Sequence, residues 1–277
     1  MSSPHEVVEE RSQRQGRHAS GRPQTRAVIL AAGRGRRMGE MTEARPKCLL
    51  PVGGRTLLEH QLETLSALGV AKITVVSGYC SDQVRERVEG RASVVENEHW
   101  AETNSLYSLA LCRDAAICKS LLVLNGDVIA HPAIVERVLT APTSAFAYDS
   151  SSGSSEEHMK VELRGDRLHS MSKVLPRARV HGENVGILGF QGSAPLLLFQ
   201  EAESVLKRAG RMQWLAAAVE GIARRAPLYG LDVANLPWRE VDFPEDLIAA
   251  RSITWPALCA DPWVPDAATR SPRQRIA

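Results

Sequence analysis

The stretch that decides the fold reads AVILAAGRGRRMGEMTEARPK and covers residues 27–47. Its first six residues are apolar, which predicts a short buried strand. The 15 residues from Gly33 to Lys47 then turn on glycine and carry five Lys or Arg against two Glu. Glycines let backbone amides approach a ligand closely, and successive amides form a concavity that binds anions. A buried strand that leads into such a loop predicts an enzyme that handles nucleotides.

The residues that follow alternate between strand and helix patterns. Thr56 and Glu59 form a capping-box signature that opens a helix to about residue 68. Further strands are predicted over residues 72–77, 93–96 and 120–125, and further helices over residues 82–88 and 104–112. This alternation predicts an α/β fold with a doubly wound, mostly parallel sheet.

After residue 141 the pattern changes, which predicts a mixed second half with an antiparallel element. Strands are predicted over residues 144–148, 159–163, 167–171, 184–190 and 228–233, with a further short apolar segment at 238–242, and helices over 195–207, 213–224 and 244–251. We divide the chain into a flexible extension (1–24), a catalytic domain (25–254) and an irregular tail (255–277). The domain has a nucleotide-binding half (25–141) and an acceptor-binding half (142–254), which would bind a second substrate, the acceptor.

Composition excludes several classes of protein. The net charge of +2 over 277 residues argues against a nucleic-acid-binding protein. No apolar run approaches the roughly 18 residues of a membrane span. The polar N-terminus lacks the apolar core of a secretion signal, so we expect a cytoplasmic protein. The five cysteines form no C-x-x-C pair, which favours reduced thiols over a zinc site.

Two acidic residues are placed to hold a metal ion. Asp127 directly follows the strand predicted at 120–125, and Asp242 also follows a short apolar segment. Ligands of open α/β sheets bind beyond the carboxyl ends of the strands, and Mg²⁺ prefers a few carboxylates together with phosphate oxygens. The alternatives are that Asp127 belongs to a turn and that Asp242 caps the last helix. The loop itself matches neither the G-x-G-x-x-G dinucleotide pattern nor a Walker P-loop.

Two longer patterns carry a resemblance to a known superfamily. Residues 30–38 read LAAGRGRRM and residues 46–58 read PKCLLPVGGRTLL, which is similar to the signature of nucleotidyltransferases that join a nucleoside triphosphate to a small phosphate. Later segments, among them 159–161, 182–187 and 241–247, resemble the phosphocholine and aminoethylphosphonate cytidylyltransferases. The resemblance spans roughly residues 26–252 and implies a Rossmann-like nucleotidyltransferase fold.

The resemblance also implies the roles of individual residues. CTP, the co-substrate, would lie over a turn and a helix start, bound by Leu30, Ala31, Ala32, Gly33, Gly35, Gly78, Asn104 and Ser108. Arg37, Lys47 and Lys160 would be catalytic cations, and Asp127 and Asp242 would hold Mg²⁺. The acceptor would contact Lys173, Arg177, Glu183 and Trp214. An exposed strand position for Lys160 and a turn role for Glu183 remain alternatives, and a homodimer is expected from the family.

The acceptor itself is a small phosphonate or phosphomonoester in this interpretation. Trp214 is followed by Leu215, where an acid would suit a cationic headgroup, and Lys and Arg residues surround this region. These features favour a small acceptor that is not cationic, unless the basic residues simply form a solvated face. The rival functions are a sugar-1-phosphate nucleotidyltransferase that uses another nucleotide and a non-catalytic nucleotide-binding protein.

Overall fold

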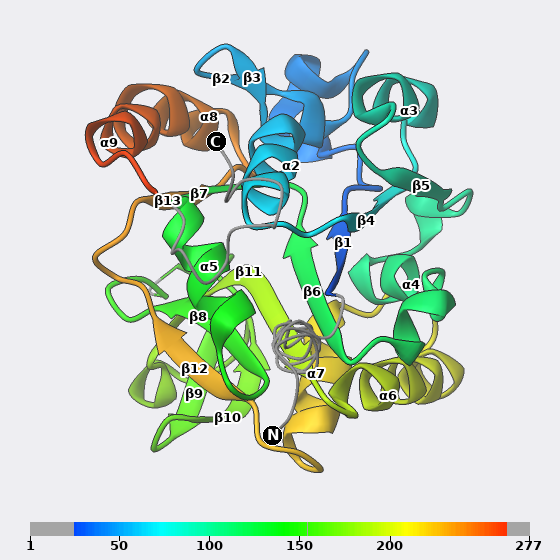
Figure 1. The fold of residues 1–277 in the computed structure, drawn as a ribbon. Helices are drawn as coiled ribbons and strands as arrows, with labels where there is room; N and C mark the ends of the chain where they lie inside the picture. The colour runs from blue at the N-terminus through cyan, green and yellow to red at the C-terminus, as the bar shows by residue number, and fades with distance from the viewer. Residues whose placement is uncertain (1–24, 154, 265–277) are drawn as a thin grey trace, which may run out of the picture.

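The computed structural model describes residues 25–153 and 155–264, so the extension predicted at 1–24 lies outside them. Within these residues the main element is a mixed sheet (Figure 1). Its strands are β1 (Arg26–Leu30), β4 (Lys72–Ser77), β5 (Ser93–Glu96), β6 (Ser120–Asn125), β8 (Ala145–Asp149), β9 (Lys160–Arg164), β10 (Arg167–Ser172), β11 (Gly182–Gln191) and β12 (Tyr229–Asp232). Their order is β5-β4-β1-β6-β11-β8-β12-β10-β9.

The first half of the sheet is parallel. β1 lies between β4 and β6, with Ile29 opposite Val75 on one side and Leu124 on the other. These strands are almost continuously apolar because helices cover both faces of the sheet. From β11 onward the sheet is mixed: β11 runs antiparallel to β6 and β8, whereas β12 runs parallel to β8. The predicted doubly wound α/β fold with a mixed second half is confirmed.

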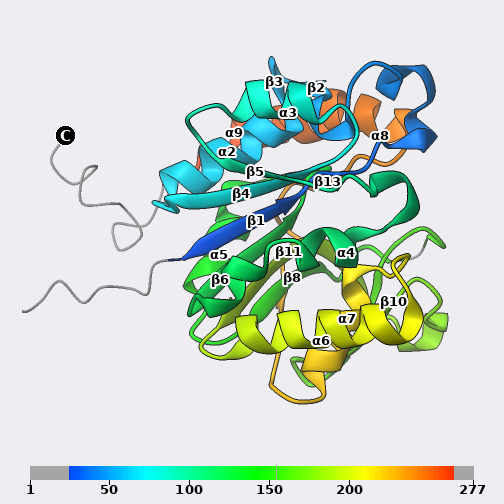
Figure 2. The ribbon, with the colours of Figure 1, turned by 90° about the vertical axis from the view of Figure 1, so that its right-hand side faces the viewer.

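Six helices cover the two faces of the sheet within the described residues. On one face α2 (Leu57–Ala67), α3 (Ser81–Val88) and α5 (Pro132–Thr140) enclose one apolar core, and on the other α4 (Ser105–Ala110), α6 (Ala194–Ala209) and α7 (Leu215–Ala223) enclose a second. Figure 2 shows the layers edge on, with the sheet between α2 and α3 above and α4, α6 and α7 below. The predicted capping box of α2 is present, since Thr56 Oγ1 accepts from the Glu59 amide and the Glu59 carboxylate accepts from the Thr56 amide.

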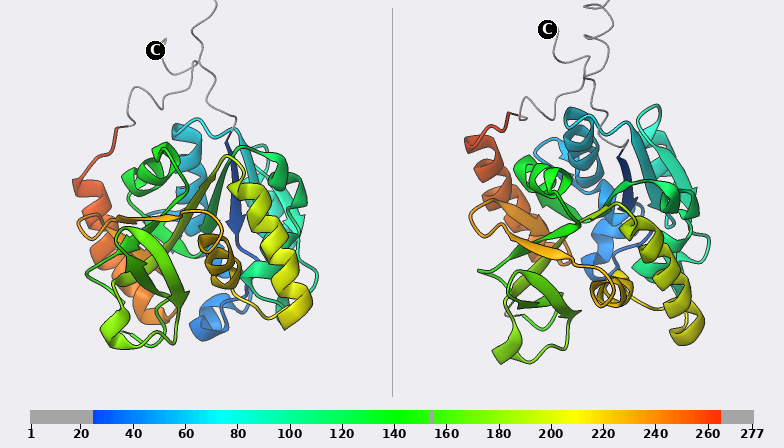
Figure 3. Two further views of the ribbon diagram at one scale, coloured as in Figure 1. Left: turned by 90° about the horizontal axis from the view of Figure 1, so that it is seen from below. Right: turned by 60° about the horizontal axis from the view of Figure 1, so that its bottom comes forward.

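The C-terminal part differs from the prediction. Helix α8 (Pro244–Ala249) continues through a π-helical turn (Ala250–Thr254) into α9 (Trp255–Ala260), so the first part of the predicted irregular tail is helical. Pro256 lies directly after the π-helical turn, near the start of α9. The Trp255 ring packs on His60 at 5.0 Å between centroids and fills the space above Gly53. Seen from below, α8 and α9 (orange to red) and α6 (yellow) lie at opposite sides of the molecule (Figure 3, left).

Two small strand pairs and one unpredicted helix complete the fold. β2 (Pro51–Val52) pairs with β3 (Arg55–Thr56), and β7 (Val128–Ala130) pairs with β13 (Trp238–Glu240). Helix α5 was not predicted because its N-cap is His131, which is not a common capping residue; its Nδ1 accepts from the Ala133 amide. None of the helices in the described residues is long and apolar enough to cross a membrane. All five cysteines lie in the described residues as free thiols.

Candidate active site

A cavity of about 250 Å³ lies beyond the carboxyl ends of β1 and β6. It is lined by most of the residues that the sequence singled out. These are Leu30, Ala31, Ala32, Gly33, Gly35, Arg37, Lys47, Asn104, Ser108, Asp127, Lys173, Trp214 and Asp242. Four other predicted residues, Gly78, Lys160, Arg177 and Glu183, are not among its lining residues. We call this the first cavity.

The turn after β1 needs glycine for two reasons. Gly35 has φ of 78°, in the left-handed region, and a Cβ there would come within 2.9 Å of the Lys47 Cβ atom. The turn after β6 packs equally closely, because a Cβ on Gly126 would lie 2.8 Å from the Ala31 Cβ atom. The Gly126 amide also donates to the Leu30 carbonyl at 2.9 Å. These contacts hold Lys47 and Asp127 beside the same turn.

Lys47 joins the two predicted metal ligands. Its Nζ lies 2.5 Å from Asp127 Oδ2 and 2.6 Å from Asp242 Oδ1, and its side chain is only 13% exposed. Burial opposes the charge of Lys47, but the two carboxylates raise its pKa above the ordinary value. Burial likewise acts to raise the pKa of Asp242, but Lys47 and Arg37 hold it below its usual range. Lys47 and Asp242 are therefore charged at neutral pH.

A third carboxylate, which the sequence analysis did not assign, completes this group. Oxygens of Asp127, Glu240 and Asp242 lie within 4.8 Å of one another. Burial, together with the charges of Asp127 and Asp242, raises the pKa of Glu240 to about 8. A signal for Glu240 existed in the sequence, because residues two apart on an extended strand point to the same side. Glu240 stands at that spacing from Asp242.

The three carboxylates fit a divalent cation. Asp127 Oδ1 is buried and has no hydrogen-bond partner in the described part of the chain, so it is available to a ligand. A set of carboxylate oxygens is the donor set that Mg²⁺ prefers. We refer to Asp127, Glu240 and Asp242 as the carboxylate cluster.

Asp242 does not cap the last helix. The Asp242 and Phe243 amides both donate to Asp246 Oδ2, at 3.0 and 2.9 Å, so Asp246 provides the cap of α8. The Val241 amide donates to the Asp127 carbonyl at 2.9 Å, which brings this segment against the turn after β6. The Asp242 side chain is thereby left to contact Lys47 and Arg37.

The start of α4 and the loop before α7 form the opposite wall of the first cavity. Asn104 caps α4 through its Oδ1 atom, and its own amide donates to the Arg211 carbonyl at 3.1 Å. The Leu215 amide donates to Ser105 Oγ at 2.8 Å, so Trp214 is held close to this helix start. Gly78 does not line the first cavity, but it packs against a residue that does. A Cβ on Gly78 would come within 2.8 Å of the Ala32 carbonyl oxygen.

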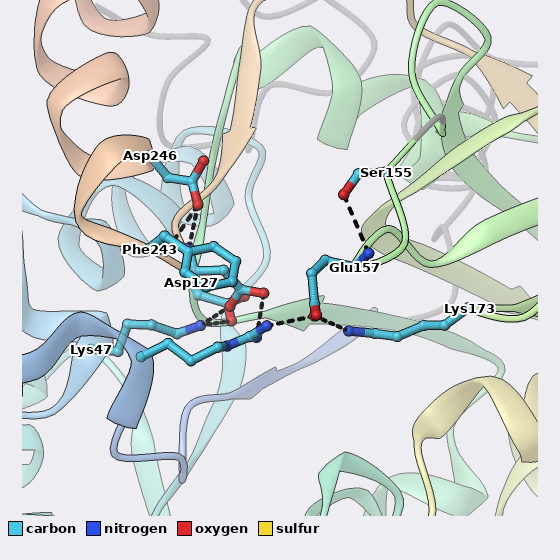
Figure 4. Close-up of polar contacts among 9 residues, drawn as sticks. Lys47, Asp127, Ser155, Glu157, Lys173, Phe243 and Asp246 are labelled. Atoms are coloured by element: carbon cyan, nitrogen blue, oxygen red, sulfur yellow. Dashed lines mark hydrogen bonds and ion pairs between the residues drawn. The ribbon is translucent and has the colours of Figure 1, made fainter.

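A chain of ion pairs runs along the first cavity from Asp242 through Arg37 and Glu157 to Lys173. Glu157, which the sequence analysis did not assign, has one oxygen 2.7 Å from Arg37 Nη1 and 3.2 Å from Lys173 Nζ (Figure 4). Arg37 also contacts Asp242 at 2.5 Å and stacks on the Phe243 ring at 4.7 Å. Lys173 in turn lies over the Trp214 ring at 5.2 Å. The contacts with Lys173 and Arg37 lower the pKa of Glu157.

The other predicted cations lie further away. Lys160 is buried on β9, and its Nζ donates to the Lys173 carbonyl, so it holds the backbone at Lys173. Arg177 is exposed on a 3-10 turn (Arg177–Arg179). The catalytic role of Lys160 and the acceptor role of Arg177 stay predictions.

Glu183 belongs to a second cavity of about 320 Å³. This second cavity shares Glu157, Glu240 and Asp242 with the first and is otherwise lined by Asp149, Ser152, Ser155, His158, Glu183, Trp238, Arg239, Phe243 and Asp246. Acidic side chains dominate it.

Glu183 and His158 lie together in the second cavity, where burial shifts the pKa of each toward its neutral form. Burial, opposed in part by a hydrogen bond from Ser152, raises the pKa of Glu183 to about 7, and burial lowers that of His158. His158 Nδ1 accepts from the Gly153 amide at 3.1 Å and therefore carries no proton. Glu183 Oε2 lies 3.1 Å from the same nitrogen, a contact that requires a protonated carboxyl group.

A doubly wound α/β fold with this site defines a nucleotide-binding transferase domain. The chain belongs to the MobA-like NTP transferase domain family, which matches residues 27–220. The expected superfamily is thus confirmed.

Curated relatives of the chain are similar over most of its length. It is 32% identical over 240 residues to the CMP-5'-(3-aminopropyl)phosphonate synthase of Streptomyces rubellomurinus, which covers 80% of this chain and 37% of that protein. It is also 32% identical over 237 residues to the bifunctional IPC transferase and DIPP synthase of Rubrobacter xylanophilus, covering 82% and 51%. The chain therefore matches about a third to a half of the length of these proteins.

A solved structure shows the same fold. The CTP:phosphocholine cytidylyltransferase of Streptococcus pneumoniae superposes with a TM-score of 0.68 at 20% identity, covering 83% of this chain and 99% of that one. At this identity the likeness concerns the fold.

Proposed function

We propose that the chain is a cytidylyltransferase that transfers CMP from CTP to a small phosphonate or phosphomonoester and releases pyrophosphate. The observation that carries the proposal is the contact of Lys47 with both Asp127 and Asp242 at the turn after β1. This contact supports the proposal, because Lys47 would bind phosphate and the neighbouring carboxylates would bind a divalent metal. The names of the relatives from S. rubellomurinus and S. pneumoniae support cytidylyl transfer over other nucleotidyl transfers.

The reaction needs little covalent chemistry from the protein. An oxygen of the acceptor's phosphonate or phosphate attacks the α-phosphorus of CTP, the new P–O bond forms, and the bond from the α-phosphorus to the bridging oxygen of pyrophosphate breaks. The attacking oxygen is already an anion, so no general base is required. Catalysis then rests on positioning and on neutralising charge.

The described residues supply both the positioning of the substrates and the neutralisation of their charge. The glycine turn presents backbone amides to the triphosphate, and the raised pKa of Lys47 keeps that side chain charged throughout the physiological range. Asp127, Glu240 and Asp242 would hold Mg²⁺, which polarises phosphoryl oxygens and neutralises their charge when it is bound. Trp214 and the start of α4 line the same cavity and would help to position the substrates.

A matrix of substrates tests the proposal. Purified protein with MgCl₂ is incubated with each of CTP, UTP, GTP and dTTP, against 3-aminopropylphosphonate, 2-aminoethylphosphonate, 2-hydroxyethylphosphonate, phosphocholine, inositol 1-phosphate and glucose 1-phosphate. Pyrophosphate release is measured, and the product is identified by mass. We expect release with CTP and at least one phosphonate or phosphomonoester, and its loss when EDTA replaces MgCl₂.

Three other outcomes would contradict the proposal. Turnover with UTP, GTP or dTTP and glucose 1-phosphate alone would indicate a sugar nucleotidyltransferase. CTP binding without turnover of any acceptor would indicate a binding protein. Full activity in EDTA would exclude a role of the carboxylate cluster as an Mg²⁺ site. A strong preference for phosphocholine would separately refute the expectation of an acceptor that is not cationic.

A further inference from the structure

Glu157 closes the first cavity by connecting two cations from distant segments. Arg37 comes from the loop after β1, and Lys173 follows β10, so the three residues meet only in the folded chain. A single oxygen of Glu157 serves both cations, at 2.7 Å from Arg37 Nη1 and 3.2 Å from Lys173 Nζ. Figure 4 shows the Glu157 carboxylate with Lys173 on one side and Lys47 and Asp127 on the other.

Displacement of Glu157 would release Arg37 Nη1 and Lys173 Nζ for a second anion, while Arg37 Nη2 stays paired with Asp242. Among the described residues that line the first cavity, the cationic side chains are Arg37, Lys47 and Lys173. Lys47 is already engaged by Asp127 and Asp242. An oxygen between Arg37 and Lys173 has the surroundings that a phosphoryl or phosphonyl oxygen requires, since a guanidinium and an ammonium both donate to it.

The ion pairs of Glu157 are weak enough for another anion to replace them. The Glu157 side chain is 51% exposed, and ion pairs with such exposure are weak. Its backbone amide is anchored locally by Ser155 Oγ at 3.3 Å, so the loop can stay in place when the carboxylate moves. A phosphonate or phosphate dianion carries more charge than one carboxylate and competes well for the same cations.

Movement of Glu157 would also connect the two cavities. Glu157 lines both of them, and each offers a few hundred cubic ångströms, about 250 and 320 Å³. An acceptor whose anionic group displaced Glu157 could therefore extend its other end into the second cavity. Arg37 would remain next to Asp242, at the edge of the carboxylate cluster.

We propose that Glu157 holds the place of the acceptor's phosphoryl or phosphonyl group, and that Arg37 and Lys173 form the subsite for this group once Glu157 is displaced. The proposal rests on the proposed function for the nature of the acceptor. The inference goes beyond the proposed function because it assigns Arg37 to the acceptor and gives Glu157 the role of a competing internal anion.

The first test uses methylphosphonate as a probe, without nucleotide, and measures its binding by calorimetry. Glu157→Gln removes the competing charge at nearly constant size, and we expect it to bind methylphosphonate about fivefold more tightly than the wild type. Glu156→Gln is the matched control, because this neighbouring acid is exposed and is not among the lining residues of either cavity. It should change affinity by less than about twofold.

A third variant and a kinetic measurement make the test specific. Adding Lys173→Met to Glu157→Gln should abolish the gain in methylphosphonate affinity. In turnover assays, Glu157→Gln should lower KM for the acceptor while KM for CTP stays unchanged. Equal affinity of wild type and Glu157→Gln for methylphosphonate would overturn the proposal, as would an equal gain in Glu156→Gln.

Failure of this inference can be distinguished from failure of the proposed function. If no nucleotide is turned over but Glu157→Gln still gains affinity that depends on Lys173, the anion subsite stands and the cytidylyltransferase assignment falls. If CTP is turned over and Glu157→Gln changes neither acceptor KM nor methylphosphonate affinity, the subsite assignment alone falls.

Discussion

The two cavities share a wall but differ in charge. The first combines the glycine turn after β1 with three cations, whereas the second is lined by six acids against Arg239 and His158. The second cavity would repel a polyphosphate, whereas in the first cavity three cations offset most of the charge of its four acids. The difference shows that the carboxylates of the shared wall act in opposite ways. On one side Asp242 is neutralised by its ion pair with Lys47, and on the other, where burial does most to raise the pKa of Glu183, the charge of Asp242 adds to that rise.

The largest effect is expected from Asp127, on the neutralised side. Asp127→Asn keeps the shape of the side chain but removes one charge and one metal-binding oxygen from the carboxylate cluster. We expect kcat/KM for CTP-dependent pyrophosphate release to fall by about a thousandfold, because electrostatic stabilisation of this kind is usually the largest contribution to catalysis. Asp82→Asn, at an exposed position of α3, is the control and should retain full activity. Comparable activity of Asp127→Asn and wild type would refute the metal assignment.

The next effect concerns the cation between the two carboxylates. Lys47→Met leaves Asp127 and Asp242 without their shared partner, and removal of one member of a buried ion pair costs about 3 kcal/mol of unfolding free energy. Urea unfolding in EDTA measures this loss. Because Mg²⁺ would no longer compete with the Lys47 ammonium, we expect added MgCl₂ to restore more stability to the variant than to the wild type. An identical loss with and without Mg²⁺ would show that the carboxylate cluster does not bind the metal.

The acidic side of the wall gives a pH-dependent effect. The pKa of Glu183 rises from an ordinary value of 4.5 to about 7 in the folded chain. Between these values the folded state binds more protons than the unfolded state, so stability falls as pH rises and the loss is complete above pH 7. We expect a loss of about 2 kcal/mol between pH 5 and pH 7 in urea unfolding.

Glu183→Gln removes this titration. Its unfolding free energy should lack the part of the decline that Glu183 causes, so the difference between variant and wild type should grow in favour of the variant from pH 5 to pH 7. If both proteins lose stability in parallel over this range, Glu183 is not the protonated group that its contact with His158 implies.

The elements around the turn after β1 could be predicted well from sequence because their signals are local. A strand of apolar residues, a glycine turn and the Thr56–Glu59 capping box each depend on neighbours in the chain. The strands over residues 72–77, 93–96 and 120–125 were predicted with the bounds that the structure shows. Asp127 and Asp242 were found because strand ends meet at one edge of a sheet.

The contacts around Glu157 and Lys173 could be predicted less well because they join distant segments. Glu157 meets Arg37 across 120 residues, and no spacing in the sequence indicates such a pair. The alternative for Lys160 was an exposed position on a strand, but β9 pairs with both β10 and β11, which buries its side chain against the Lys173 backbone. A sequence pattern places a residue on a strand, whereas the neighbours of that strand decide which way its charge can be used.

The smallest expected effect distinguishes two cations that the sequence treated alike. Lys173 lines the first cavity, but Arg177 is exposed and contacts neither cavity in the described residues. Lys173→Ala should raise KM for the acceptor about tenfold, as expected for a charged hydrogen-bond donor to an anion. Arg177→Ala should change KM by less than about twofold, as is usual for an exposed charge. Should Arg177→Ala raise KM as much as Lys173→Ala, the 3-10 turn must move toward the cavity when the acceptor binds, and the acceptor side would then be assembled only in the complex.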